Sequence, residues 1–89
     1  MPCISMFYGL LIYMYFFDNK EHKIPHIHVE YQGKKSVFAI ESAELIVGDI
    51  SNKHRKLVEA WIELRHDELL ADWHLAISGQ DLFKIEPLR

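Results

Sequence analysis

The sequence predicts an α+β fold: an antiparallel sheet of about four to five N-terminal strands, packed on one face by one or two C-terminal helices. Two observations favour it. Short apolar or alternating segments occupy the first half of the 89 residues, and apolar residues at helical spacings occupy most of the second half. The length corresponds to a single domain over residues 1–89, and a hydrophobic fraction of 49% is ample for one core.

Five segments have the length and composition of strands. Gly9 indicates a tight turn after Tyr8, because glycine adopts positive φ without steric cost. A second turn is expected over 32–35, where Gly33 is followed by two lysines. The expected strands are 4–7, 10–17, 26–32, 36–40 and 44–47.

The second of these strands is apolar throughout, which is typical of a strand covered on both faces. Since the helices can cover only one face, half of its side chains should form an apolar patch on the other, and such patches usually mark protein interfaces. We therefore expect a homodimer, or a stable complex with another protein, formed through this face or its edge. The side chains expected in the core are Leu10, Ile12, Met14 and Phe16, and those expected on the other face are Leu11, Tyr13, Tyr15 and Phe17.

The second half of the chain predicts one bent helix or two helices between residues 52 and 78. Ser51 or Asp49 can cap the start, and Gly79 is suited to end the helical segment. The polar stretch 65–68 favours a break, with Asp67 as the cap of a second helix. Acidic residues, Asp72 among them, are expected outside the apolar helix face. Apolar residues of the tail 81–89 should dock on the sheet.

A strictly alternating segment follows Pro25, which favours an extended entry into a strand. Alternation puts polar and apolar side chains on opposite faces of a strand. One face of this strand should carry His26, His28 and Glu30, and the other Ile27, Val29 and Tyr31.

Three hypotheses fit the two histidines. They can share a divalent transition metal ion, with His22, Glu21, Asp18 or Glu30 as a further ligand, since catalytic zinc usually has three protein ligands. They can instead act as a general acid–base pair, as in metal-free RNA cleavage. They can also be ordinary polar residues of a half-exposed strand, in a protein that only binds a partner.

A second candidate site is the basic run 52–56, which contains Lys53 and Arg55. Positive charge at a helix start opposes the helix macrodipole, and such a placement can indicate a bound anion. Alternatively, Arg55 simply pairs with Glu59 on an exposed face. The net charge of −3 does not support general nucleic-acid binding. The apolar run 6–17 is too short to span a bilayer, so no membrane association is expected. The single cysteine, Cys3, fits a reducing, cytoplasmic setting.

The chain as a whole resembles a small bacterial family known as domain of unknown function 4160. The segments that carry the resemblance are Pro25-His26-Ile27-His28-Val29-x-Tyr31, Trp61-Ile62-x-Leu64, Glu68-Leu69 to Trp73, Ile85-Glu86-Pro87-Leu88, Met1-Pro2 and Gly9. The family usually has two prolines before its histidines, and here the first is Ile24. The resemblance implies a gene often found beside that of a domain of unknown function 2442, in pairs thought to be toxin–antitoxin-like modules. It assigns no catalytic residues.

Overall fold

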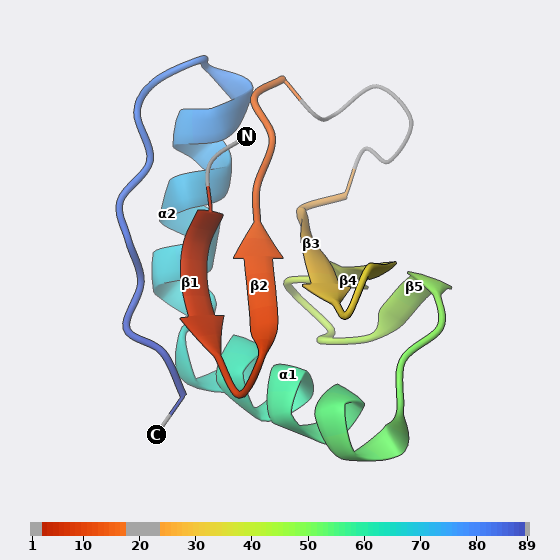
Figure 1. Ribbon diagram of the computed structural model, residues 1–89. Helices are drawn as coiled ribbons and strands as arrows, with labels where there is room; N and C mark the ends of the chain where they lie inside the picture. The colour runs from red at the N-terminus through yellow and green to blue at the C-terminus, as the bar shows by residue number, and fades with distance from the viewer. Residues whose placement is uncertain (1–2, 18–23, 89) are drawn as a thin grey trace.

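The structure of the chain is a computed structural model that describes residues 3–17 and 24–88. Five antiparallel strands form one sheet in chain order, and two helices lie behind it (Figure 1). The predicted α+β fold is confirmed, with two helices rather than one. The strands are β1 (Cys3–Phe7), β2 (Leu10–Tyr13), β3 (His26–Tyr31), β4 (Lys34–Ala39) and β5 (Leu45–Gly48); the helices are α1 (Asn52–Leu64) and α2 (His66–Ile77).

Two-residue turns close the first and third hairpins. Tyr8 and Gly9 have φ of 49° and 78°, and Gln32 and Gly33 have φ of 50° and 83°. Positive φ at both central residues is the requirement of a type I′ turn, whose twist matches that of the flanking strands. The turn between β3 and β4 is shorter than the 32–35 turn expected from the sequence, so β4 begins at Lys34.

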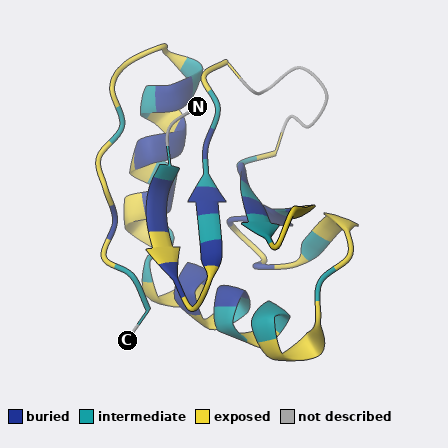
Figure 2. Cartoon of the chain, in the orientation of Figure 1, coloured by how far each residue is buried: buried dark blue, intermediate teal, exposed yellow. Residues whose placement is uncertain are grey.

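The core lies between the helix-facing side of the sheet and the inner faces of α1 and α2. In Figure 2, buried and more exposed positions alternate along β2, as expected for a strand with one covered face. At least 17 buried residues form a single cluster. Its largest fully buried apolar side chains are Trp61, Phe38, Ile4, Leu10, Ile12, Met14, Ile27, Ile40, Ile62 and Leu69.

The second strand is shorter than predicted, because the chain leaves the sheet after Tyr13. Phe17 has φ of 56°, and its N–H donates to the carbonyl of Ala76 near the end of α2, at 3.0 Å. This satisfies a helix-terminal carbonyl that has no partner within the helix. Phe16, which we expected in the core, is therefore 41% exposed.

Of the three predicted helix ends, two are confirmed and one is wrong. Ser51 caps α1 by accepting a hydrogen bond from the His54 N–H at 3.3 Å, and Gly79 follows α2 with φ of 72°. Asp67 is not the cap of α2: Arg65 occupies that position and makes no side-chain capping bond. Neither helix has the length and apolarity needed to cross a membrane, among the residues that the structure describes.

The C-terminal tail covers the β1 edge of the sheet. The Ile85 N–H donates to the Ile4 carbonyl at 2.8 Å, and the Ser5 hydroxyl donates to the Ile85 carbonyl at 2.9 Å. Ile85 is buried as expected, whereas Phe83 is 71% exposed. At the opposite edge, β5 has β4 as its one partner among the described strands.

Candidate functional site

His26 is the first residue of β3, and its side chain is buried, with 1% exposure. Its Nδ1 lies 2.8 Å from the carbonyl oxygen of Ile24. Because a carbonyl only accepts, the imidazole donates from Nδ1, which leaves the lone pair of the neutral ring on Nε2. The ring lies 4.9 Å from that of Trp73 on α2, between centroids. The His26 ring is thus fixed by its hydrogen bond to Ile24, just before β3, and by its contact with Trp73 of α2.

His28 follows two residues later and is half-buried. Its ring centroid lies 5.2 Å from that of His26 and 4.2 Å from that of Tyr15. Ile27 and Val29 are buried in the core. Burial along β3 follows the predicted alternation from Ile27 to Glu30 but not at His26, which is as buried as Ile27. The two imidazoles are neighbours. Tyr15 and Trp73 were not anticipated beside them, since both lie far from His28 in sequence.

The two rings are close enough to act on one ligand, but the described residues do not complete a metal site. No group of three histidine, cysteine or acidic side chains suited to a metal ion occurs within residues 3–17 and 24–88. His22, Glu21 and Asp18, proposed as alternative third ligands, lie outside the described residues. The Nδ1–H hydrogen bond of His26 to a backbone carbonyl is nevertheless typical of metal-ligating histidines, in which it orients the ring.

Glu30 lies further along the same face of β3. It stands opposite Leu11 of β2 and Lys35 of β4 in the strand register. Tyr13 stands opposite His28. Burial raises the pKa of the Tyr13 hydroxyl, and the charges of Glu30 and Cys3 raise it further. Polar and aromatic groups therefore share this side of the sheet.

We call this side the open sheet face. No helix covers it in Figure 1. Its members follow from the register of the five strands, and from the ring contacts of Tyr15. They include Met6, Leu11, Tyr13, Tyr15, His28, Glu30, Lys35, Val37 and Val47.

Lys53 and Arg55, the other predicted binding residues, are not brought to the histidines. They lie in the first turn of α1, where His54 stacks on Tyr31 with ring centroids 4.0 Å apart. Tyr31 ends β3 and His26 begins it, so roughly 16 Å of strand separates the two places. Arg55 also forms an ion pair with Glu59 at 3.2 Å, as predicted by the hypothesis that the basic run is an ordinary exposed face.

The fold and the histidine strand together define a small α+β protein with a His-x-His motif at the start of its central strand. Residues 9–74 match the sequence profile of the family described as domain of unknown function (DUF4160), and the chain belongs to that family. No curated protein matched the chain, and no solved structure matched it.

Proposed function

We propose that this protein is the partner-binding component of a two-protein, toxin–antitoxin-like module of the bacterial cytoplasm. The partner is a small protein encoded beside it, as the family resemblance implies. The open sheet face is the proposed contact surface.

The observation that carries this proposal is the apolar and aromatic character of the open sheet face. Met6 is 63% exposed and Val47 is 49% exposed, and the rings of Tyr13 and Tyr15 stack with centroids 6.4 Å apart. Tyrosine is enriched in protein interfaces, because it combines a large apolar surface with a hydrogen-bonding group. The hydrogen bonds of the tail go to β1, α1 and α2, and Met6 and Val47 remain exposed.

Co-expression with the adjacent gene product tests the proposal. We expect the tagged chain to purify with its partner, and light scattering to give the mass of the complex. Placing charge on the contact face by combining Met6→Lys with Val47→Lys should weaken the complex at least tenfold, because the new ammonium groups would have to be desolvated. Leu64→Lys is the matched control: Leu64 is 69% exposed but lies on α1, so binding should be unchanged.

The result for the isolated chain separates the two kinds of partner. A doubled mass that the same paired substitutions abolish would identify a second copy as the occupant of the open sheet face. A monomer that binds no adjacent gene product would refute the proposal.

A second candidate function, metal binding by His26 and His28, is favoured by the Nδ1 hydrogen bond of His26. Protein purified without a His tag should then contain close to one transition-metal ion per chain, and His26→Ala with His28→Ala should remove it. His74→Ala, at an exposed position of α2, is the control. Metal-free protein with chelator-resistant RNA cleavage and a bell-shaped pH profile would favour the acid–base pair instead.

A further inference from the structure

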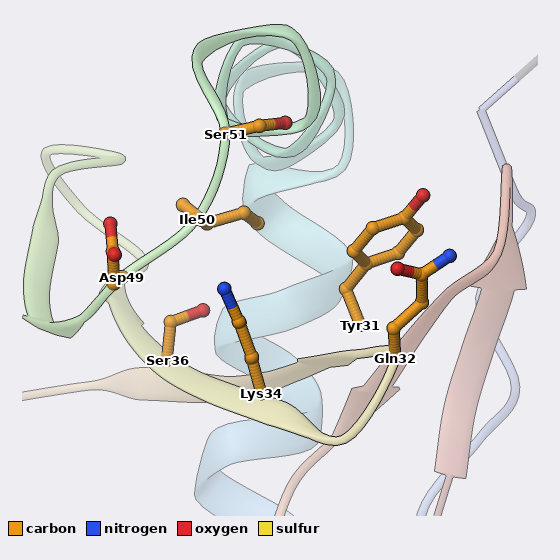
Figure 3. Close-up of a pocket in the computed structure, with 7 residues that line it drawn as sticks. All are labelled: Tyr31, Gln32, Lys34, Ser36, Asp49, Ile50 and Ser51. Carbon is orange, nitrogen blue, oxygen red and sulfur yellow. The ribbon is translucent and has the colours of Figure 1, made fainter.

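A cavity of about 290 Å³ lies between the tip of the β3–β4 hairpin and the segment 49–51 that leads into α1 (Figure 3). Tyr31, one of its lining residues, packs against the core, so the cavity lies on the helix side of the sheet. It is separate from the open sheet face and from the two histidines.

Gly48 allows the segment 49–51 to pass close to β4. Its φ is 101°, and a Cβ atom there would lie 2.4 Å from the carbonyl oxygen of Lys35 and 2.7 Å from the Cα of Ser36. Any other residue at position 48 would push β5 away from β4. The glycine therefore allows the close approach of the two strands just before the segment 49–51.

The cavity has an aromatic wall and an apolar wall. The Tyr31 ring forms the first, and His54 supports it by stacking at 4.0 Å between centroids. Ile50 forms the second, across from Tyr31 in Figure 3. Ser36 adds a hydroxyl from a side chain that is only 3% exposed. A planar apolar group fits between such walls.

Two opposite charges also line the cavity. Lys34 comes from β4 and Asp49 from the segment before α1. They do not form an ion pair: between described residues, the ion pairs involve Arg55, Arg65 and His66 as the cationic partners. A cation and a carboxylate, both on exposed residues, thus line the same cavity without an ion pair between them.

We propose that this cavity binds a zwitterion of amino-acid size with a planar side chain. The ligand carboxylate is held by the Lys34 ammonium group, the ligand ammonium group by the Asp49 carboxylate, and the planar side chain by the Tyr31 ring. The volume lies at the small end of ligand-binding sites, which restricts the ligand to about the size of one aromatic amino acid. The inference is independent of the proposed partner binding, since it concerns the other side of the sheet.

An NMR titration with L-phenylalanine tests the inference. We expect saturable shifts of the Tyr31, Ser36 and Ile50 amides at millimolar ligand. Two analogues, 3-phenylpropionate and 2-phenylethylamine, each lack one of the two charges and should bind about tenfold more weakly or worse, because one charged hydrogen bond is lost in each case. Equal binding of either analogue would contradict the zwitterion requirement.

Substitutions in the cavity complete the experiment. Lys34→Gln and Asp49→Asn should each weaken L-phenylalanine binding about tenfold. Lys35→Gln is the matched control: Lys35 is the next residue of β4 but belongs to the open sheet face, so binding should be unchanged. The absence of saturable shifts with L-phenylalanine would overturn the inference. So would inorganic phosphate as the only Lys34-dependent ligand, since it would identify a plain anion site.

Discussion

Asp72 of α2 is buried, with 1% exposure, although the sequence favoured a place outside the apolar helix face. Its Oδ1 accepts a hydrogen bond from the N–H of Phe83 in the tail, at 3.0 Å. Its Oδ2 has no hydrogen-bond partner in the part of the chain that the structure describes. Burial raises the pKa of the Asp72 carboxyl above its usual value, against the lowering effect of the Phe83 N–H. The charged form of Asp72 therefore destabilises the folded state, although the Oδ1 atom is needed to accept the hydrogen bond from Phe83.

The raised pKa predicts a pH dependence of stability. The folded protein binds the Asp72 proton more tightly than the unfolded chain does, so this residue lowers the free energy of unfolding as pH rises from the unfolded pKa through the higher folded pKa. Asp72→Asn keeps the acceptor for Phe83 and removes the charge. We expect the variant to gain stability relative to the wild type as pH rises from 4 to 7, measured by urea unfolding.

The exposed carboxylate of Asp81 provides the control for this prediction. Asp81→Asn should leave the pH profile of the wild type unchanged. A stability difference between Asp72→Asn and the wild type that does not vary with pH would show that the Asp72 carboxyl does not titrate in this range.

At the scale of the element, α1 begins with basic residues and has no acidic residue in its first turn. This arrangement opposes the helix macrodipole, so the start of the helix depends on its cap. The Ser51 hydroxyl accepts from the His54 N–H and also lies 2.7 Å from the Nδ1 of His54. The Ser51 side chain therefore contacts both the backbone N–H and the imidazole ring of His54.

Ser51→Ala should lower the free energy of unfolding by about 1 kcal/mol, the usual effect of losing such a cap. Ser51→Asn, which can accept the same backbone hydrogen bond, should restore most of the loss. Urea unfolding monitored through tryptophan fluorescence measures both, since Trp61 lies on the same helix. Equal stability of all three proteins would mean that the helix start is held by its packing alone.

At the scale of the whole molecule, the C-terminal tail joins the sheet to both helices. It bonds to β1 through Ile85, to α2 through Phe83, and to α1 through the Glu86 carbonyl, which accepts from the Trp61 indole at 2.8 Å. Ile85 is 4% exposed and belongs to the core cluster. The tail is therefore part of the fold rather than an appendage.

Ile85→Ala should lower the free energy of unfolding by about 2–4 kcal/mol, because it removes buried apolar atoms and leaves a cavity. Phe83→Ala, two residues earlier in the same tail, should change it by less than about 0.5 kcal/mol, since its ring is exposed. A small effect of both substitutions on urea unfolding would show that the core does not depend on the tail.

The sequence by itself determined the class of fold and the alternation of β3. Period-2 and period-3.6 patterns reflect which side chains must leave water, and these patterns hold wherever one face of an element is buried. They predicted the burial of Ile27 and Val29 and the more exposed position of His28 between them, but not the burial of His26. The Ser51 cap was also predictable, because its hydrogen bond joins residues three apart in the chain.

Only the tertiary structure decided where contacts between distant segments change the local pattern. Phe16 leaves the core because its neighbour Phe17 bonds to the end of α2, and Asp72 is buried because the tail folds over it. Likewise, Tyr15 packs beside His28 and Trp73 beside His26, and Lys34 and Asp49 line one cavity. Local periodicity encodes neither arrangement. The physical reason is that each of these environments depends on packing between elements that lie far apart in sequence.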